Sequence, residues 1–124
     1  MSGINKVMLI GHLGKTPELR TLEDEIAVTS FPLATSEMIT KSGIRSEITE
    51  WYNVVMWRGL AEVASRILQK GQLVYIEGKL TTRNFSDKEG RAHYITEIIA
   101  EKFTLLGRKS DFENIDTIPH IIAP

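Results

Sequence analysis

The sequence predicts an all-β fold, a five-stranded Greek-key barrel with one α-helix between its third and fourth strands and a long protruding hairpin. Two observations carry this prediction. Five stretches alternate side chains at the period of two that is typical of strands, and turn-forming residues separate them. One stretch switches to the helical period, and it lies between the third and the fourth of these strands.

Composition places the chain among ordinary globular domains. It has 124 residues, of which 42% are hydrophobic and 25% charged, enough for one domain with a real core. The absence of cysteine excludes disulfides, thiolate nucleophiles and cysteine metal sites. No run of 18 apolar residues and no signal-peptide pattern occur, so we expect a cytoplasmic protein.

Charge is unevenly distributed although the net charge is only −1. Residues 110–124 contain Asp111, Glu113 and Asp116 but no lysine or arginine, and periodicity is lost from Lys109 onward. We therefore expect a domain over residues 1–108 and a short, flexible, acidic tail over residues 109–124.

The first two strands are predicted over residues 5–13 and 26–35. Both faces of the first are apolar, so one should enter the core. The other should either contact another subunit or be covered by the same chain, and the sequence does not separate these two. Pro32 cannot donate a ladder hydrogen bond, so it should mark an edge or a bulge. Residues 18–25 should form a solvated loop, and residues 40–46 an exposed hairpin tip or loop.

The third strand, over residues 50–60, contains both tryptophans of the chain. Trp51 and Trp57 should lie on one face of it. They should serve either packing or a platform on which flat ligands stack. The helix follows from an apolar stripe at i, i+3, i+4, i+7 and i+8 from Leu60. Lys70 and Gly71 should close its C-terminus.

The long hairpin is predicted from strands over residues 74–80 and 93–100, a turn over 86–91 and a short closing piece over 103–106. Lys79, Arg83 and Phe85 should share one face near its exposed tip. Cations that contact phosphates beside rings that stack on bases are typical of sites for single-stranded nucleic acid. The alternative is a cation lying along a packed ring. With Trp51 and Trp57 in view, binding is favoured.

Catalytic and metal chemistry have no such support. His12, His93 and His120 lie in three different segments without ligand spacing. Residues 11–16 lack the full spacing of a phosphate-binding loop, and no helix follows them. We therefore expect a protein that is not an enzyme and has no metal or other cofactor.

Several segments, in order over residues 4–107, resemble the bacterial-type single-stranded DNA-binding protein family. They are residues 4–18, Leu33-Ala34-Thr35-Ser36-Glu37, Thr49-Glu50-Trp51, Leu60-Ala61-Glu62-Val63-Ala64, Val74-Tyr75-Ile76-Glu77-Gly78, Tyr94-Ile95-Thr96-Glu97 and Leu106-Gly107. The resemblance implies an OB-fold, a homotetramer and single-stranded DNA wrapped around it. It also implies a role in replication, recombination and repair, near the nucleoid.

The family's stacking aromatics correspond to Trp51, Trp57 and Phe85. The resemblance leaves Lys70, Lys79 and Arg83 as phosphate contacts and places Ile39 where many members carry a further tryptophan. Positions that are often basic in the family hold other residues here, which are Asn53, Gly59, Thr81 and Asn84. The salt dependence of DNA binding should therefore be shallower than in more basic members.

The tail departs most from the family. Members usually end in a long linker and an acidic tip that recruits replication and repair proteins. Residues 116–119 resemble that tip only faintly, so support for recruitment is weak. The second hypothesis is an OB-fold accessory module of the primosome type, which contacts proteins and binds DNA weakly. The three aromatics argue against it.

Overall fold

The structure is a computed structural model that describes residues 3–108. The predicted tail, residues 109–124, lies outside the described residues. The elements in chain order are β1 (Val7–Leu13), β2 (Arg20–Thr21), β3 (Ala27–Lys41), β4 (Ile44–Trp57), α1 (Arg58–Ile67), β5 (Gln72–Ser86) and β6 (Ala92–Arg108).

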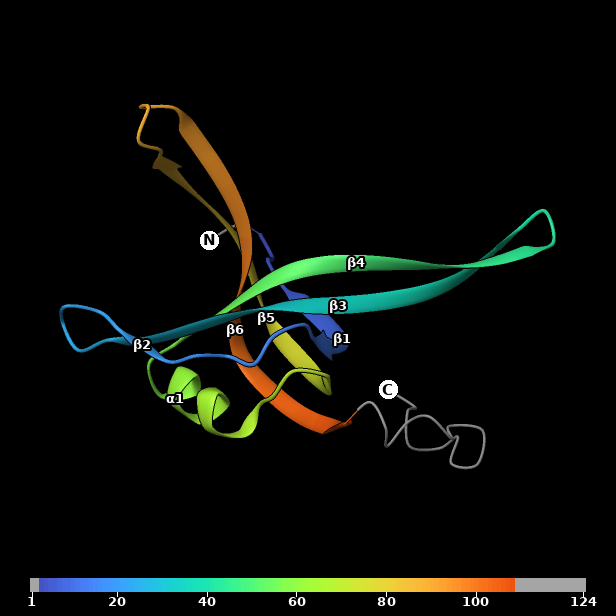
Figure 1. Ribbon diagram of the computed structural model, residues 1–124, viewed down its shortest axis with the longest axis horizontal. Coiled ribbons are helices and arrows are strands. Elements are labelled where there is room, and N and C mark those ends of the chain that lie inside the picture. The colour runs from blue at the N-terminus through green and yellow to red at the C-terminus, as the bar shows by residue number, and fades with distance from the viewer. Residues whose placement is uncertain (1–2, 109–124) are drawn as a thin grey trace.

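Five of the strands close into a barrel (Figure 1). Neighbouring strands follow the order β1-β5-β6-β4-β3-β2, and β1 also pairs with β3, which closes the ring and leaves β2 as a short addition. β4 and β6 are parallel, and the other pairs are antiparallel. The helix α1 connects β4 and β5, the third and fourth strands of the barrel. The predicted fold is confirmed.

The core consists of the inward faces of the barrel strands and the buried side of α1. Ala61 and Ala64 of the helix are fully buried, and their small side chains let it lie close to the strands. The largest fully buried side chains are Leu13, Leu33, Met56, Leu68, Ile76, Ile98, Val54, Val74 and Thr29. Within residues 3–108 no helix has the length and apolar content needed to cross a bilayer.

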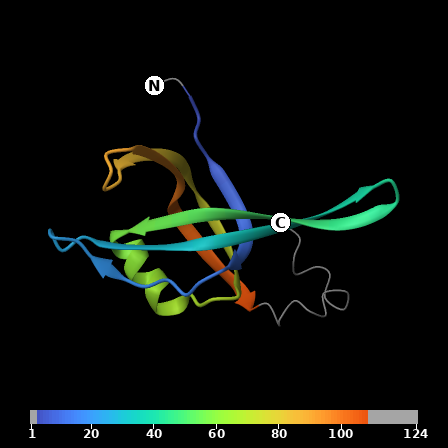
Figure 2. The same ribbon diagram turned by 45° about the horizontal axis from the view of Figure 1, so that its top comes forward.

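Two hairpins extend beyond the barrel, β3–β4 to one side and β5–β6 upward (Figures 1 and 2). The predicted strands over residues 26–35 and 50–60 stop short of the hairpin tip, because the register continues outward to Lys41↔Ile44. At its other end the predicted strand over 50–60 runs too far, because β4 ends at Trp57 and residues 58–60 belong to α1. Most side chains of this arm are exposed on both faces, so no burial pattern signals the strands. The predicted exposed tip is confirmed. Ser42 and Gly43 have φ of 53° and 80°, as a two-residue hairpin turn requires.

Three further predictions need correction. The loop over residues 18–25 contains β2, which pairs with the start of β3. The returning strand and closing piece form one strand, β6, with a bulge opposite Glu77 and Gly78. The helix ends at Ile67, where the Leu68 N–H still donates to the Ala64 carbonyl. Gly71 (φ 89°) lies beyond the helix and donates to the Leu13 carbonyl, because the chain turns there to enter β5.

Pro32 marks an edge rather than a bulge. Its register with Asn53 of β4 is uninterrupted. On the other side of β3, pairing with β2 ends at Val28 and pairing with β1 begins at Leu33. Pro32 therefore lies in the part of β3 that pairs with neither β2 nor β1 on this side. Its missing N–H costs no hydrogen bond between strands there.

The two faces of β1 differ in burial. Val7 and Leu9 pack against the core, whereas Met8 and Ile10 are 62% and 45% exposed. Cover by another part of the same chain is thus wrong for the described residues. Contact with another subunit stays a prediction.

Glu77 of β5 pairs with Met8, so it lies on the outer surface of the barrel. Two lysines surround its carboxylate. Lys6 Nζ lies 2.8 Å and Lys102 Nζ 3.5 Å from Glu77 Oε2, and the Tyr75 hydroxyl donates to Oε1 at 2.6 Å. The hydrogen bond from Lys6, followed by that from Tyr75, lowers the pKa of Glu77 from 4.5 to about 2.

This lowered pKa predicts an acid-sensitive contribution to stability. A carboxyl whose pKa is lower in the folded state stabilises the fold above its unfolded pKa, near 4.5, and loses that effect as the pH falls toward 2. We expect the urea midpoint of the parent protein, measured by circular dichroism, to fall more steeply between pH 4.5 and 2 than that of Glu77→Gln. Glu89→Gln is the matched control, because the Glu89–Arg91 pair is exposed. Equal slopes for the parent and Glu77→Gln would contradict this assignment.

Candidate nucleic-acid interface

The strand register places both tryptophans on the same sheet face as Lys79. Ile99 of β6 pairs with Lys79 of β5 and with Val55 of β4. Paired residues point to the same face, and residues two apart along a strand do so as well. Trp51 and Trp57 are four residues before and two residues after Val55. They therefore share a face with Lys79, although they come from a different strand.

The same face continues to the end of the β5–β6 hairpin. Arg83 and Phe85 follow Lys79 at even spacing, and the register between Lys79 and Ser86 has no shift. The outer surface formed by Trp51, Trp57, Lys79, Arg83 and Phe85 is called the aromatic face below. It combines the third barrel strand with the hairpin between the fourth and fifth strands, where OB-folds bind their ligands.

The rings of the aromatic face are open to solvent. Trp51 is 60% exposed, Trp57 40% and Phe85 41%. Burying aromatic side chains of this size is strongly favourable. Three such rings exposed to solvent on one face are therefore typical of a binding surface. Packing of the two tryptophans in the core is therefore wrong for the described residues, whereas packing at an interface and a platform for ligands both stay predictions.

Trp51 is nonetheless held in place. A Cβ atom on Gly14 would lie 2.6 Å from Cζ3 and 2.9 Å from Cη2 of the indole, so the ring lies directly against the glycine backbone. Gly14 is fixed in turn by its N–H, which donates to the Pro32 carbonyl at 2.8 Å. The segment after β1 thus supports one side of the indole and leaves most of the surface of Trp51 exposed to solvent.

The cations of the aromatic face are not equivalent. Lys79 is exposed. Arg83 is bound to Glu97 of β6, with Nε 2.9 Å from Oε1 and Nη2 3.5 Å from Oε2. Any phosphate that binds Arg83 has to share it with this carboxylate. Glu97 has no distinguishing signal in the sequence, because only the register between β5 and β6 brings it beside Arg83.

Lys70 lies away from the aromatic face. Its backbone N–H donates to Thr16 Oγ1 at 2.9 Å, and its side chain is exposed. Thr16 belongs to the segment after β1 that also contains Gly14. The structure therefore puts Lys70 beside the loop that supports Trp51, on the flank of the other five residues.

The positions of three other residues on the two hairpins bear on the predicted DNA site. His93 pairs with Phe85 and stacks on its ring, although its sequence position gave no signal for this. Tyr94 is 72% exposed but points to the opposite face of the same hairpin. Ile39 pairs with Ser46, and the register puts it on the opposite face of β3–β4 from Trp51.

Comparison with known proteins identifies the family of this chain. Residues 4–106 match the model of the family described as "Single-strand binding protein family". The chain belongs to this family. It is 38% identical over 122 residues to single-stranded DNA-binding protein 1 of Xylella fastidiosa, a match that covers 97% of this chain and 90% of the relative. It is 49% identical over 109 residues to the protein of the same name from Chlorobaculum tepidum, covering 86% and 67%.

A solved member of the family has the same fold. The Plasmodium falciparum SSB in complex with ssDNA superposes with a TM-score of 0.74 at 31% identity, and the match covers 85% of this chain and 95% of that one. The family match and these relatives do not favour the accessory-module hypothesis.

Proposed function

We propose that this protein binds single-stranded DNA without sequence preference through the aromatic face. Bases stack on Trp51, Trp57 and Phe85, because every base has a π-face. Phosphates contact Lys79 and Arg83, and Lys70 extends the path along the flank. The observation that carries the proposal is the single face on which the register gathers exposed rings and cations from β4 and β5. Relatives named as single-stranded DNA-binding proteins support it.

In this proposal residues 1–108 form the DNA-binding domain. The protein is not an enzyme and protects transient single strands during replication, recombination and repair, in the cytoplasm close to the nucleoid. It acts as a homotetramer, and the exposed apolar side of β1 with Met8 and Ile10 supplies contact area between subunits. Size-exclusion chromatography with light scattering should give about four times the 14.0 kDa chain mass. The monomer mass would contradict the assembly.

Intrinsic fluorescence tests DNA binding directly. The only two tryptophans of the chain both lie on the aromatic face, so poly(dT) should quench their emission strongly. A duplex competitor should not restore the emission. Absence of quenching by poly(dT) would reject the proposal and favour the accessory module.

Salt dependence gives a residue-level prediction. The logarithm of the affinity should fall with the logarithm of the salt concentration by about 0.7 for each phosphate neutralised. Lys79→Gln should therefore reduce the slope by about 0.7 per chain. Arg83→Gln should reduce it less, because Glu97 competes with phosphate for the guanidinium. Lys102→Gln is the control, since Lys102 pairs with Glu77 at the surface of β1 and β5. An affinity that ignores salt would contradict the phosphate contacts.

A further inference from the structure

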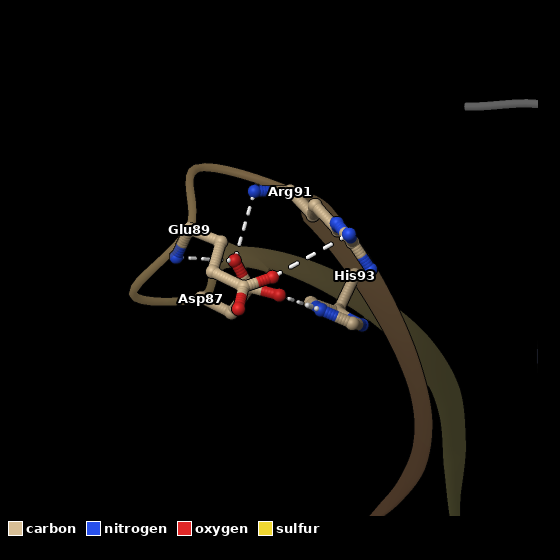
Figure 3. Close-up of polar contacts among 4 residues, drawn as sticks. All are labelled: Asp87, Glu89, Arg91 and His93. Carbon is tan, nitrogen blue, oxygen red and sulfur yellow. Dashed lines mark hydrogen bonds and ion pairs between the residues drawn. The ribbon is translucent and has the colours of Figure 1, made fainter.

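The tip of the β5–β6 hairpin is organised around one carboxylate (Figure 3). Asp87 Oδ1 accepts the backbone N–H groups of Glu89 and Arg91, each at 2.9 Å. Asp87 Oδ2 lies 2.7 Å from His93 Nε2. Because an ionised carboxylate only accepts hydrogen bonds, Nε2 of His93 carries the proton that it donates. Asp87 thus ties the turn and the imidazole together.

The same imidazole lies against a ring of the aromatic face. His93 is the cross-strand partner of Phe85. Their ring centroids are 5.1 Å apart and their planes differ by 19°, a stacked pair. The guanidinium carbon of Arg83 lies 5.9 Å from the Phe85 centroid. One side of the Phe85 ring is therefore occupied by a group whose own position Asp87 determines.

We propose that His93 is a positioning residue for Phe85: Asp87 holds the imidazole against one side of the ring, and the charge on the imidazole sets how strongly the hairpin tip binds single-stranded DNA. The proposal rests on the proposed function. It adds a residue that acts through Phe85 and a dependence of binding on pH.

Charge balance gives the direction of the effect. With a neutral imidazole the Asp87–His93 pair carries −1 and repels phosphate. When the imidazole is protonated, the pair carries no net charge and no longer repels phosphate. The imidazolium of His93 is then a cation that attracts both the π-system of Phe85 and the DNA. Imidazole is the side chain that changes charge between pH 5 and 8. Single-stranded DNA should therefore bind more tightly as the pH falls through this range.

Several charged groups surround His93, and most of them are paired with one another. The charged residues around His93 on the two strands and the turn are Arg83, Asp87, Lys88, Glu89, Arg91 and Glu97. Arg83 pairs with Glu97, and Arg91 pairs with Glu89. The His93 hydrogen bond, followed by that from the Arg91 backbone, lowers the pKa of Asp87, which favours its ionised form.

The test measures the affinity of fluorescein-labelled oligo(dT) by anisotropy at pH 8.0 and pH 6.0, at constant ionic strength. The parent protein should bind about two- to five-fold more tightly at pH 6.0. His93→Gln keeps a donor for Asp87 but does not titrate, so this gain should disappear. His93→Arg keeps a planar cation at both pH values, so it should bind more tightly than the parent at pH 8.0 and show no gain at pH 6.0. His120→Gln is the control for a histidine elsewhere in the chain and should retain the gain.

A double-mutant cycle separates positioning from a direct contact. If His93 acts through Phe85, the effects of His93→Gln and Phe85→Leu on affinity should not add. Circular dichroism and light scattering verify that each variant is folded, and His93→Arg carries the test if His93→Gln does not fold. A pH gain that persists in His93→Gln, or additive effects in the cycle, would overturn the inference while leaving the proposed function in place. A parent protein that does not bind oligo(dT) at either pH would overturn both.

Discussion

Replacing Trp51 with alanine is expected to weaken binding of single-stranded DNA by about 1–3 kcal/mol, roughly 5- to 150-fold in affinity. Trp51 is the most exposed ring of the aromatic face, and its indole lies directly against the backbone of Gly14. Its loss removes a stacking surface that needs little reorganisation to bind a base. Anisotropy of labelled oligo(dT) measures the change.

Two variants control for this loss. Trp51→Phe keeps a π-face and should retain most of the affinity. Tyr94→Ala removes the most exposed ring of the β5–β6 hairpin from its opposite face and should cost much less than Trp51→Ala. If Trp51→Ala binds oligo(dT) as tightly as the parent, the aromatic face is not the DNA site.

Gly78→Ala is expected to destabilise the barrel by at least about 1–3 kcal/mol. A Cβ on Gly78 would lie 2.2 Å from the Ile99 carbonyl oxygen and 2.9 Å from the Ala100 Cα. These are backbone atoms of β6 beside the bulge, and they cannot move aside as a flexible side chain would. The glycine is thus required by the close approach of β5 and β6. Urea denaturation followed by circular dichroism measures the loss.

Gly59→Ala is the matched control. Gly59 lies in α1, and a Cβ there would meet nothing within 4 Å. Alanine in a helix is about 0.5–1 kcal/mol more favourable than glycine, so this variant should be as stable as the parent or slightly more so. Equal stability of Gly78→Ala and the parent would show that the two strands separate easily at the bulge.

The barrel could be predicted because buried positions recur at regular spacing along each strand and helix, and apolar residues occupy them in the sequence. The inward residues of β1 and β5 and the apolar stripe of α1 all repeat at the period of their element. The outer half of the β3–β4 hairpin could not be predicted, because backbone pairing between two exposed strands imposes no such pattern. The helix end was misjudged for a related reason. Gly71 has the positive φ of a helix-ending glycine but serves the turn into β5.

The candidate site could be predicted strand by strand but not as a whole. Spacing alone puts Trp51 with Trp57 and Lys79 with Phe85. That these two pairs share one face depends on Ile99, which links β5 to β4. The contacts of Glu97 with Arg83 and of His93 with Phe85 depend on pairing across the hairpin. Which residues pair across the hairpin depends on the register of β5 and β6, which side-chain periodicity within one strand does not give.

The closure of the barrel through β1 has a consequence for how the chain folds. The β3–β4 and β5–β6 hairpins join neighbouring segments and can form early. β1, by contrast, must pair with β5, as in Val7↔Gly78, across 71 positions of the chain. At a synthesis rate of about 5–20 residues per second, Val7 is added to the chain roughly 4 to 14 seconds before Gly78. β1 pairs with β3 only through His12 and Leu13, so most of its pairing waits for β5, and pairing over such a distance in the chain is slow.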